Sequence, residues 1–428
     1  MMKIYLSLCF VSLSVFADRL SLSQMISEAL EKSPQLGEQQ AQLEVAKAQE
    51  SLARAKGLMG AKLETLVGPI PGAEGAAANS RTKWDDWGPF VSNTLDIWQP
   101  IYAFGSLSSA REAGKAGVNA ETKLLERDRW KLRYEIAELY YGYQLAYELA
   151  EMGQDFVSKL EIAYKKIGTK NSKSRQVLYN LTELKTQVAE ALKSKQQAKM
   201  AMGWKVGRQS DDNIQWDQSN LVKRQVSESK IQDWKKNFTQ SRPEWQALEN
   251  EVIAKKALAE VDEGLAWPQL FLFGRAQYND ASNRVNSSKG PFSFDSTNTK
   301  YAAAGLGLRW NLALFENSAQ RSKTRAEAKK AEAKKSYLQA GLLLEAEKTI
   351  GDFKQRQEAL ELREKADQEA RESWKESMIS FGLKNLAPEK LFQAMADYGI
   401  QHKKYLEAIY QYNLMSYKLE QNLGQEIE

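Results

Sequence analysis

Few side chains in this chain could carry out acid–base, nucleophilic or metal chemistry. Its 428 residues include one histidine, His402, and one cysteine, Cys9. A catalytic triad needs a histidine between a nucleophile and a carboxylate, and a zinc site needs several His or Cys ligands at short spacing. No such spacing is present, nor is a Walker or Rossmann motif. We therefore interpret His402 as a packed or surface residue of a helix, and we expect no enzyme, cofactor or metal site.

Two pairs of neighbouring carboxylates, Asp85-Asp86 and Asp211-Asp212, are the other candidates for catalysis. Both lie in segments whose composition predicts loops. Glycosidase chemistry needs two carboxylates that face each other across a cleft, so solvated loop charge is the favoured interpretation. The 60 Lys and Arg residues are spread among 55 Asp and Glu residues, whereas nucleic-acid binding calls for a clustered basic face. We expect no nucleic-acid partner.

The N-terminus has the pattern of a secretory signal peptide. A short basic stretch at 1–3 precedes an apolar run at 4–16, and Val15-Phe16-Ala17 is an acceptable cleavage site. The apolar run is shorter than the roughly 20 residues that a membrane-spanning helix needs. We predict that residues 1–17 are removed together with Cys9, which leaves an exported chain without a thiol.

The remainder of the chain consists of two similar halves. Pro34 and Pro243 open similar helical patterns 209 positions apart, and Trp98 and Trp310 open similar segments 212 positions apart. Offsets that change so little along the chain indicate a duplication. We predict a first repeat at 18–203, a connecting segment with little regular structure at 204–230 and a second repeat at 231–428.

Each repeat is predicted to run helix, strand, strand, long helix, helix. Alternation with period two predicts strands at about 61–68, 90–102, 267–278 and 300–313, and proline-free stretches predict long helices at about 106–167 and 316–380. At 1.5 Å per residue these helices would be roughly 93 and 98 Å long. Apolar residues at steps of three and four, such as Leu132, Ile136 and Leu139, predict lengthwise coiled-coil packing. Gly168 and Gly382 then break the helices, where glycine can adopt a left-handed cap.

Four strands cannot close a barrel, and a sheet with free edges cannot lie in hydrocarbon because its unpaired amides would have no partners. If the strands cross a membrane, two copies would supply eight strands and three copies twelve. Eight strands leave an interior filled by side chains, whereas twelve open a lumen. The residues alone do not choose between these numbers.

The strand residues favour a membrane location. Leu306, Leu308 and Trp310 alternate with Gly305, Gly307 and Arg309, so that one face is apolar and the other is small or charged. Five tryptophans lie in or near strand ends, where a membrane-interface girdle would be placed: Trp84, Trp87, Trp98, Trp267 and Trp310. The alternative is that these are core aromatics of a soluble sheet.

In order, spacing and repetition, these segments resemble the TolC-like outer-membrane efflux proteins. The residues that carry the resemblance are Trp98-Gln99-Pro100-Ile101-Tyr102-Ala103-Phe104-Gly105, Tyr140-Tyr141, Phe381-Gly382-Leu383 and the duplication itself. The resemblance covers essentially the whole mature chain, although no single motif is specific. It implies a mainly α-helical homotrimer, in which coiled-coil helices form a periplasmic α-barrel. Each chain then contributes four strands to a shared 12-stranded outer-membrane β-barrel.

The function implied by this resemblance is an outer-membrane channel of a tripartite efflux or type I secretion system in a Gram-negative bacterium. Its partners would be two further copies, outer-membrane lipid, a periplasmic adaptor and an inner-membrane pump or ABC exporter. The helix tips at Gly168, Thr169, Gly382 and Leu383 are then expected to contact the adaptor or pump. A different class of function, a soluble periplasmic coiled-coil scaffold or adaptor, also fits the long helices.

An acidic gate is a feature of the family that this sequence matches only in part. Members of the family often carry aspartates just beyond the second tip, but residues 385–394 contain none. Glu389 and Asp397 are the nearest acidic candidates for a gate. Pro388 beside Glu389 also suits an ordinary helix start.

Overall fold

A computed structural model describes residues 21–74, 81–167, 172–207, 220–231, 242–283, 297–383 and 385–427. The predicted signal peptide at 1–17 and the carboxylate pair Asp211-Asp212 lie outside these residues. The chain divides into two compact units. Unit 1 comprises residues up to 41 together with 123–246 and 338–428, and unit 2 comprises 42–122 and 247–337.

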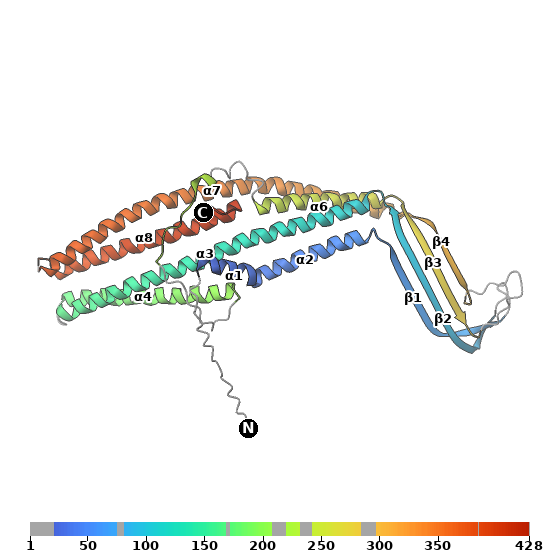
Figure 1. Ribbon diagram of the computed structural model, residues 1–428, viewed down its shortest axis with the longest axis horizontal. Coiled ribbons are helices and arrows are strands. Elements are labelled where there is room, and N and C mark those ends of the chain that lie inside the picture. Colours follow the sequence, from blue (N-terminus) through green and yellow to red (C-terminus); the bar gives the residue numbers. More distant parts are fainter. Residues whose placement is uncertain are drawn as a thin grey trace, which may run out of the picture. The chain divides into compact units, whose positions relative to one another are not determined.

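In each half the described elements run helix, strand, strand, long helix, helix, as predicted, except that the first half opens with two helices, α1 and α2 (Figure 1). They are α1 (Leu22–Lys32), α2 (Pro34–Ala55), β1 (Gly60–Glu74), β2 (Arg81–Tyr102), α3 (Ser106–Ile167), α4 (Ser172–Lys205), α6 (Pro243–Leu265), β3 (Gln269–Ala281), β4 (Lys300–Arg309), α7 (Leu314–Gly382) and α8 (Pro388–Leu423). Within the described ranges, no helix carries an apolar stretch of the length that a membrane crossing requires.

The long helices α3 and α7 contain 62 and 69 residues. Neither contains a proline, and both are rich in Ala, Glu, Lys and Leu, which are strong helix formers. The predicted seam residues Leu132 and Ile136 are fully buried in unit 1. Lengthwise packing of apolar residues at helical spacing therefore holds these helices to their neighbours, as predicted.

All four strands belong to unit 2 and form one antiparallel sheet in the order β1-β2-β3-β4 (Figure 1). β1 extends to Glu74 and β2 begins at Arg81, so both are longer than the predicted strands. The prolines and glycines after Val67 suggest a loop, but Pro69 and Pro71 instead pair with Pro89 and Trp87. β1 is an edge strand of this sheet, and proline is tolerated there because the missing N–H can face away from the ladder.

The junction between β2 and α3 is a sharp turn with a left-handed backbone. Phe104 and Gly105 have φ angles of 45° and 82°. α6 approaches this turn closely, since a Cβ built on Gly264 would lie 2.7 Å from the Phe104 carbonyl oxygen and 2.8 Å from the Ser106 nitrogen. Glycine at 264 is therefore required for the contact that fixes the sheet against the helices of unit 2.

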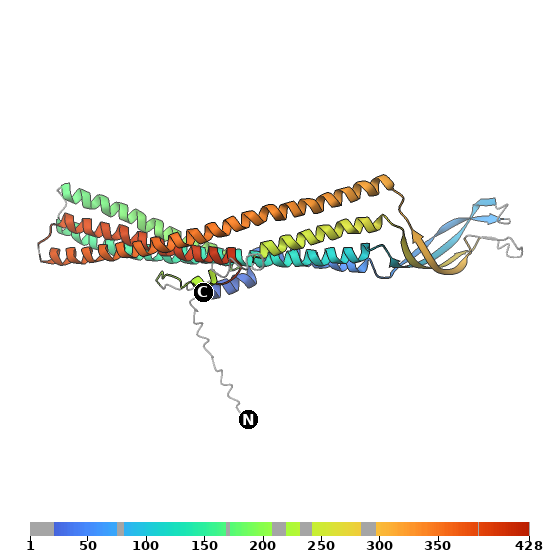
Figure 2. The ribbon, with the colours of Figure 1, turned by 90° about the horizontal axis from the view of Figure 1, so that it is seen from above.

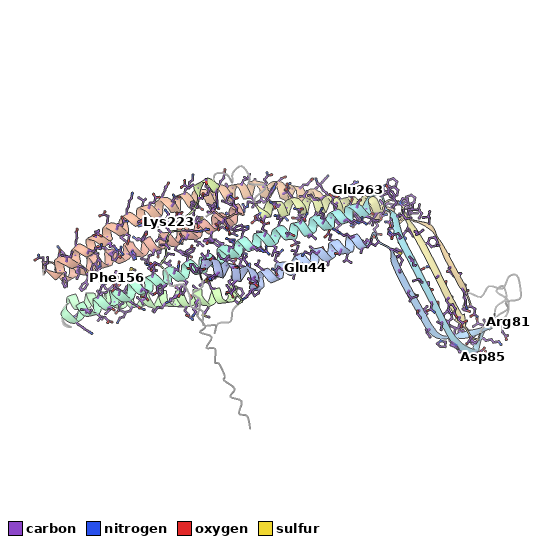
Figure 3. All side chains as sticks on the ribbon, in the orientation of Figure 1. Glu44, Arg81, Asp85, Phe156, Lys223 and Glu263 are labelled. Atoms are coloured by element: carbon purple, nitrogen blue, oxygen red, sulfur yellow. The ribbon has the colours of Figure 1, made fainter. Side chains whose placement is uncertain are left out.

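In unit 1 the hairpins α3–α4 and α7–α8 pack against each other near their tips (Figure 2). The buried cluster consists of Phe156 and Leu160 from α3, Leu181 from α4, Trp374 from α7, and Leu391 and Met395 from α8. Phe156, labelled in Figure 3, packs on Gly399 of α8, where a Cβ would lie 2.8 Å from the ring atom Cε2. The glycine thus lets α8 come close to α3.

Candidate functional site

The strand register sorts the side chains of the sheet onto two faces of opposite character, because residues directly opposite each other in a sheet share a face. The apolar face carries Leu63, Val67, Val91, Leu95, Ile97, Leu270, Leu272, Leu306 and Leu308. The polar face carries Lys62, Glu64, Asp96, Arg275, Gln277 and Arg309, together with several aromatic residues and glycines. The alternation predicted from β4 thus extends to most positions of the other strands. The exceptions on the apolar face are one row of the sheet, Thr65, Asn93, Tyr278 and Lys300, together with Gln99 and Asp280.

On the polar face, opposite charges are paired within and across strands. Arg275 donates from Nε and Nη2 to the two carboxylate oxygens of Asp96, over 2.5 and 3.1 Å, and Lys62 donates to Glu64 over 2.5 Å. Lys62, Asp96 and Arg275 lie in one row across β1, β2 and β3. Exposed pairs of this kind contribute little to stability, because water and salt screen their charges. Their main effect is to keep this face hydrophilic with little net charge.

On the apolar face, large side chains lie open in the single chain. Leu63, Leu306 and Leu308 are 69%, 66% and 66% exposed. Soluble monomers rarely expose contiguous apolar patches of more than a few hundred Å². This face is therefore built to contact something other than water.

Two groups of exposed aromatic residues lie at opposite ends of the strands. Trp84 and Trp87 lie close together in β2, 6.3 Å between ring centroids, at the end far from the helices. At the helix end, Phe104 stacks on Trp267 at 5.7 Å, and Trp310 donates its indole N–H to the Ala266 carbonyl over 3.1 Å. None of these four tryptophans is buried in a sheet core.

Trp98 lies on the other face of the sheet from the one that a membrane-interface tryptophan would occupy. Its register partners are Gly60 and Phe273, which places it on the polar face. The side chain lies across Gly60, where a Cβ would come within 2.4 Å of the indole. Trp98 therefore does not share a face with Leu95 and Ile97.

The other residues that the sequence offered as candidates for catalysis or metal binding are Asp85, Asp86 and His402. Asp85 and Asp86, the first labelled in Figure 3, lie within β2 rather than in the predicted loop, at the irregularity where the register with β1 shifts between Pro71 and Gly72. His402 lies between Tyr398 and Tyr405, and its Nδ1 is 2.9 Å from a carboxylate oxygen of Asp367. Across the described parts of the chain, no group of three or more His, Cys, Asp and Glu side chains could hold a metal ion.

The predicted tip residues are described only at the second hairpin, since Gly168 and Thr169 lie outside the described residues. Gly382 is the last residue of α7 and has no positive φ, so the predicted left-handed cap is wrong at this position. The helical pattern instead continues, with Leu383 N–H donating to the Ile379 carbonyl over 3.0 Å. Leu383 and Ile379 are exposed and give this tip an apolar surface.

The two acidic gate candidates both lie on α8. Glu389 lies in the first turn of α8, and Asp397 is exposed two turns later, where it accepts a hydrogen bond from Gln393 over 3.0 Å. A gate at either residue stays a prediction.

The connecting segment contains a buried anchor that the sequence does not indicate. Residues 220–227 have no regular secondary structure, yet Arg224 inserts its side chain between groups on α8. Its guanidinium donates to Glu420 over 2.7 Å and to Ser416 over 3.0 Å, and lies 3.9 Å from the ring centroid of Tyr417. The Arg224 backbone N–H also donates to the Asn413 side chain over 2.9 Å. This part of the segment is a fixed strap on unit 1.

No protein-family model and no curated protein sequence matches this chain. Its structure is similar to solved outer-membrane channels. CmeC of Campylobacter jejuni has a TM-score of 0.77 and 15% identity, covering 95% of this chain and 86% of CmeC. MtrE of Neisseria gonorrhoeae in its open state has a TM-score of 0.76 and 15% identity, covering 95% and 89%. VceC of Vibrio cholerae has a TM-score of 0.73 and 17% identity, covering 95% and 97%.

These similarities extend over nearly the whole of both chains, so this chain has the fold of the TolC-like outer-membrane channels. The predicted fold class, mainly α-helical with four strands in each chain, is confirmed, and the four strands form one antiparallel sheet.

Proposed function

We propose that this chain is an outer-membrane channel through which an efflux or secretion system of a Gram-negative bacterium exports its cargo. The observation that carries the proposal is the two-faced sheet in a chain with this fold. The apolar face contacts lipid and the polar face lines the lumen. A soluble scaffold would have no use for an open apolar sheet face.

The sheet edges support assembly as a homotrimer. β1 and β4 are the two ends of the sheet, and each pairs with one strand among the described residues. Backbone amides left unpaired in hydrocarbon cost several kcal/mol each. In the proposed assembly, β4 of one copy therefore pairs with β1 of the next, and three copies close a 12-stranded barrel with an open lumen.

The helical hairpin tips receive the partners in this proposal. The apolar surface at Ile379 and Leu383 supports a contact with a periplasmic adaptor or with an inner-membrane pump, which supplies the energy. Whether that pump is an ABC exporter, and which cargo it delivers, follows from the partner and not from this chain.

A cysteine scan along β4 tests directly whether the two faces of the sheet meet different surroundings. The scan is possible because the chain without residues 1–17 has no cysteine. Single cysteines replace polar-face residues Tyr301, Ala303 and Arg309 and apolar-face residues Ala302, Ala304, Leu306 and Leu308. Whole cells are treated with a membrane-impermeant maleimide. We expect labelling of the polar-face set and protection of the apolar-face set, in strict alternation.

A separate measurement addresses the soluble alternative. Sucrose-gradient fractionation followed by gels of unheated and heated samples should place the chain in the outer membrane as a heat-dissociable trimer. Recovery from the soluble periplasm as a monomer, together with equal labelling of both cysteine sets, would refute the channel.

A further inference from the structure

The polar face of the sheet carries a patch of aromatic rings next to the helices. This aromatic patch consists of Trp98 from β2 and Phe271 and Phe273 from β3. Trp98 and Phe273 are direct register partners, and the rings of Phe271 and Phe273 are 6.4 Å apart. The patch occupies two successive rows of the face between Arg309 and the charged row of Arg275.

Glycines on the flanking strands make room for these rings. A Cβ on Gly307 would lie 2.5 Å from the Phe271 ring, and one on Gly305 would lie 3.2 Å from the Phe273 ring. Gly60 accommodates Trp98 in the same way. Each ring therefore lies across a neighbouring strand with one side on the backbone. Trp98 and Phe273 remain 41% and 36% exposed, so part of their surface stays open on the polar side.

The charge beside the patch is positive and unneutralised. The Arg309 guanidinium carbon lies 5.0 Å from the ring centroid of Phe271, and among the described residues no carboxylate forms an ion pair with it. The next charged row differs, since Arg275 is held by both oxygens of Asp96. The patch thus combines open aromatic surface with one available guanidinium.

We propose that the aromatic patch and Arg309 form a binding collar for planar aromatic anions at the helix end of the lumen. The collar rests on the proposed function, because it requires the polar face to line the channel. Open ring faces stack with planar aromatic groups, and the guanidinium pairs with a carboxylate or sulfonate. The same guanidinium disfavours cations, and a saturated anion gains only the charge contact.

Strands β3 and β4 also supply a matched control on the opposite face of the sheet. Lys300 lies 4.6 Å from the Tyr278 ring centroid, so it is also a cation beside an aromatic ring. This pair lies on the apolar face. Substitutions there remove the same chemistry without touching the proposed collar.

The test measures block of single-channel current by the full-length protein in planar lipid bilayers. The probes are naphthalenesulfonate, cyclohexanesulfonate and naphthylammonium, added on the side of the strand ends remote from the helices. We expect naphthalenesulfonate to block most strongly. Phe273→Leu and Arg309→Gln should each weaken that block about tenfold, as loss of a stacking or charge-assisted contact predicts. Tyr278→Leu and Lys300→Gln should leave it unchanged, and Phe273→Tyr should retain it.

The outcomes separate the collar from the channel. A protein that conducts, but is blocked equally by all three probes or equally in variants of both faces, overturns the collar and leaves the channel intact. A protein that inserts and never conducts overturns the proposed function, and the collar with it. Heat-dissociable trimers in every variant show that a weakened block is not a folding defect. A lost block in Phe273→Tyr, which keeps the aromatic ring, would overturn the stacking contact.

Discussion

The buried anchor of the connecting segment offers the sharpest test of the packing described here. The Arg224 and Glu420 side chains are 5% and 1% exposed. Glu420 uses one oxygen, Oε1, for both the Arg224 guanidinium and the Ile427 backbone N–H. Its Oε2 is buried and accepts no hydrogen bond from the described residues. Arg224→Met would therefore leave a carboxylate buried without its cation.

The size of the effect follows from this burial. Removing one partner of a buried ion pair costs about 3–5 kcal/mol, whereas replacing both partners by neutral groups is often close to neutral. At about 1.4 kcal/mol per factor of ten, a cost of about 3 kcal/mol raises the open population of the strap roughly 100-fold. The double variant Arg224→Met with Glu420→Gln should recover most of the loss, because the introduced amide can still accept from the Ile427 N–H and needs no cation.

Limited digestion with a lysine-specific endoprotease measures the opening of the strap, because Lys223 within it and Lys230 just after it remain in every variant. When opening is fast relative to cleavage, the cleavage rate tracks the open population. The matched control is Arg325→Met, which removes an arginine from an exposed pair with Glu263 at 2.8 Å and should change little. Unchanged cleavage in Arg224→Met, or a double variant that is cleaved as fast as the single one, would refute the reasoning.

Three further predictions concern the helices. Burial raises the pKa of Glu148, against the opposing hydrogen bond from the Leu221 backbone N–H. The folded state then keeps its proton above the ordinary pKa of 4.5, so the free energy of unfolding should fall as pH rises from there to the raised pKa. Glu148→Gln should remove this decrease in the free energy of unfolding, which thermal melts at a series of pH values measure. Phe156→Ala should lower the local stability of the buried cluster near the hairpin tips by about 3–5 kcal/mol. Hydrogen exchange should then be faster near the tips of α3 and α8, and protection equal to wild type would argue against this packing. Gly382→Trp should abolish export while trimers persist, since nothing lies within 4 Å of a Cβ there; normal export would count against a partner contact at this tip.

The long helices were predictable because their signal is local. A proline-free stretch with apolar residues at steps of three and four needs no distant information, and α3 runs from Ser106 to Ile167, as predicted. The strand ends were not predictable in this way. Pro69 and Pro71 carry a local turn signal, but their place in β1 depends on pairing with β2.

The strap shows the same limit at the level of a single residue. Arg224 lies in a polar segment, and its partner Glu420 is 196 positions away. No spacing rule connects the two residues. A buried arginine therefore looks like a solvated one until the fold brings its carboxylate beside it.

For the glycines of β4, the sequence pattern predicted the correct face of the sheet but not the reason why glycine is present there. Alternation predicted that Gly305 and Gly307 share a face of small or charged residues, and the register places them there. Their neighbours on β3 add what the sequence of β4 alone does not contain, because Phe271 and Phe273 lie over these glycines. In the proposed channel, the small residues of this face are thus not simply open lumen wall. They are the space that lets aromatic rings lie flat beside the charged row of this face, and the collar proposed above depends on that space.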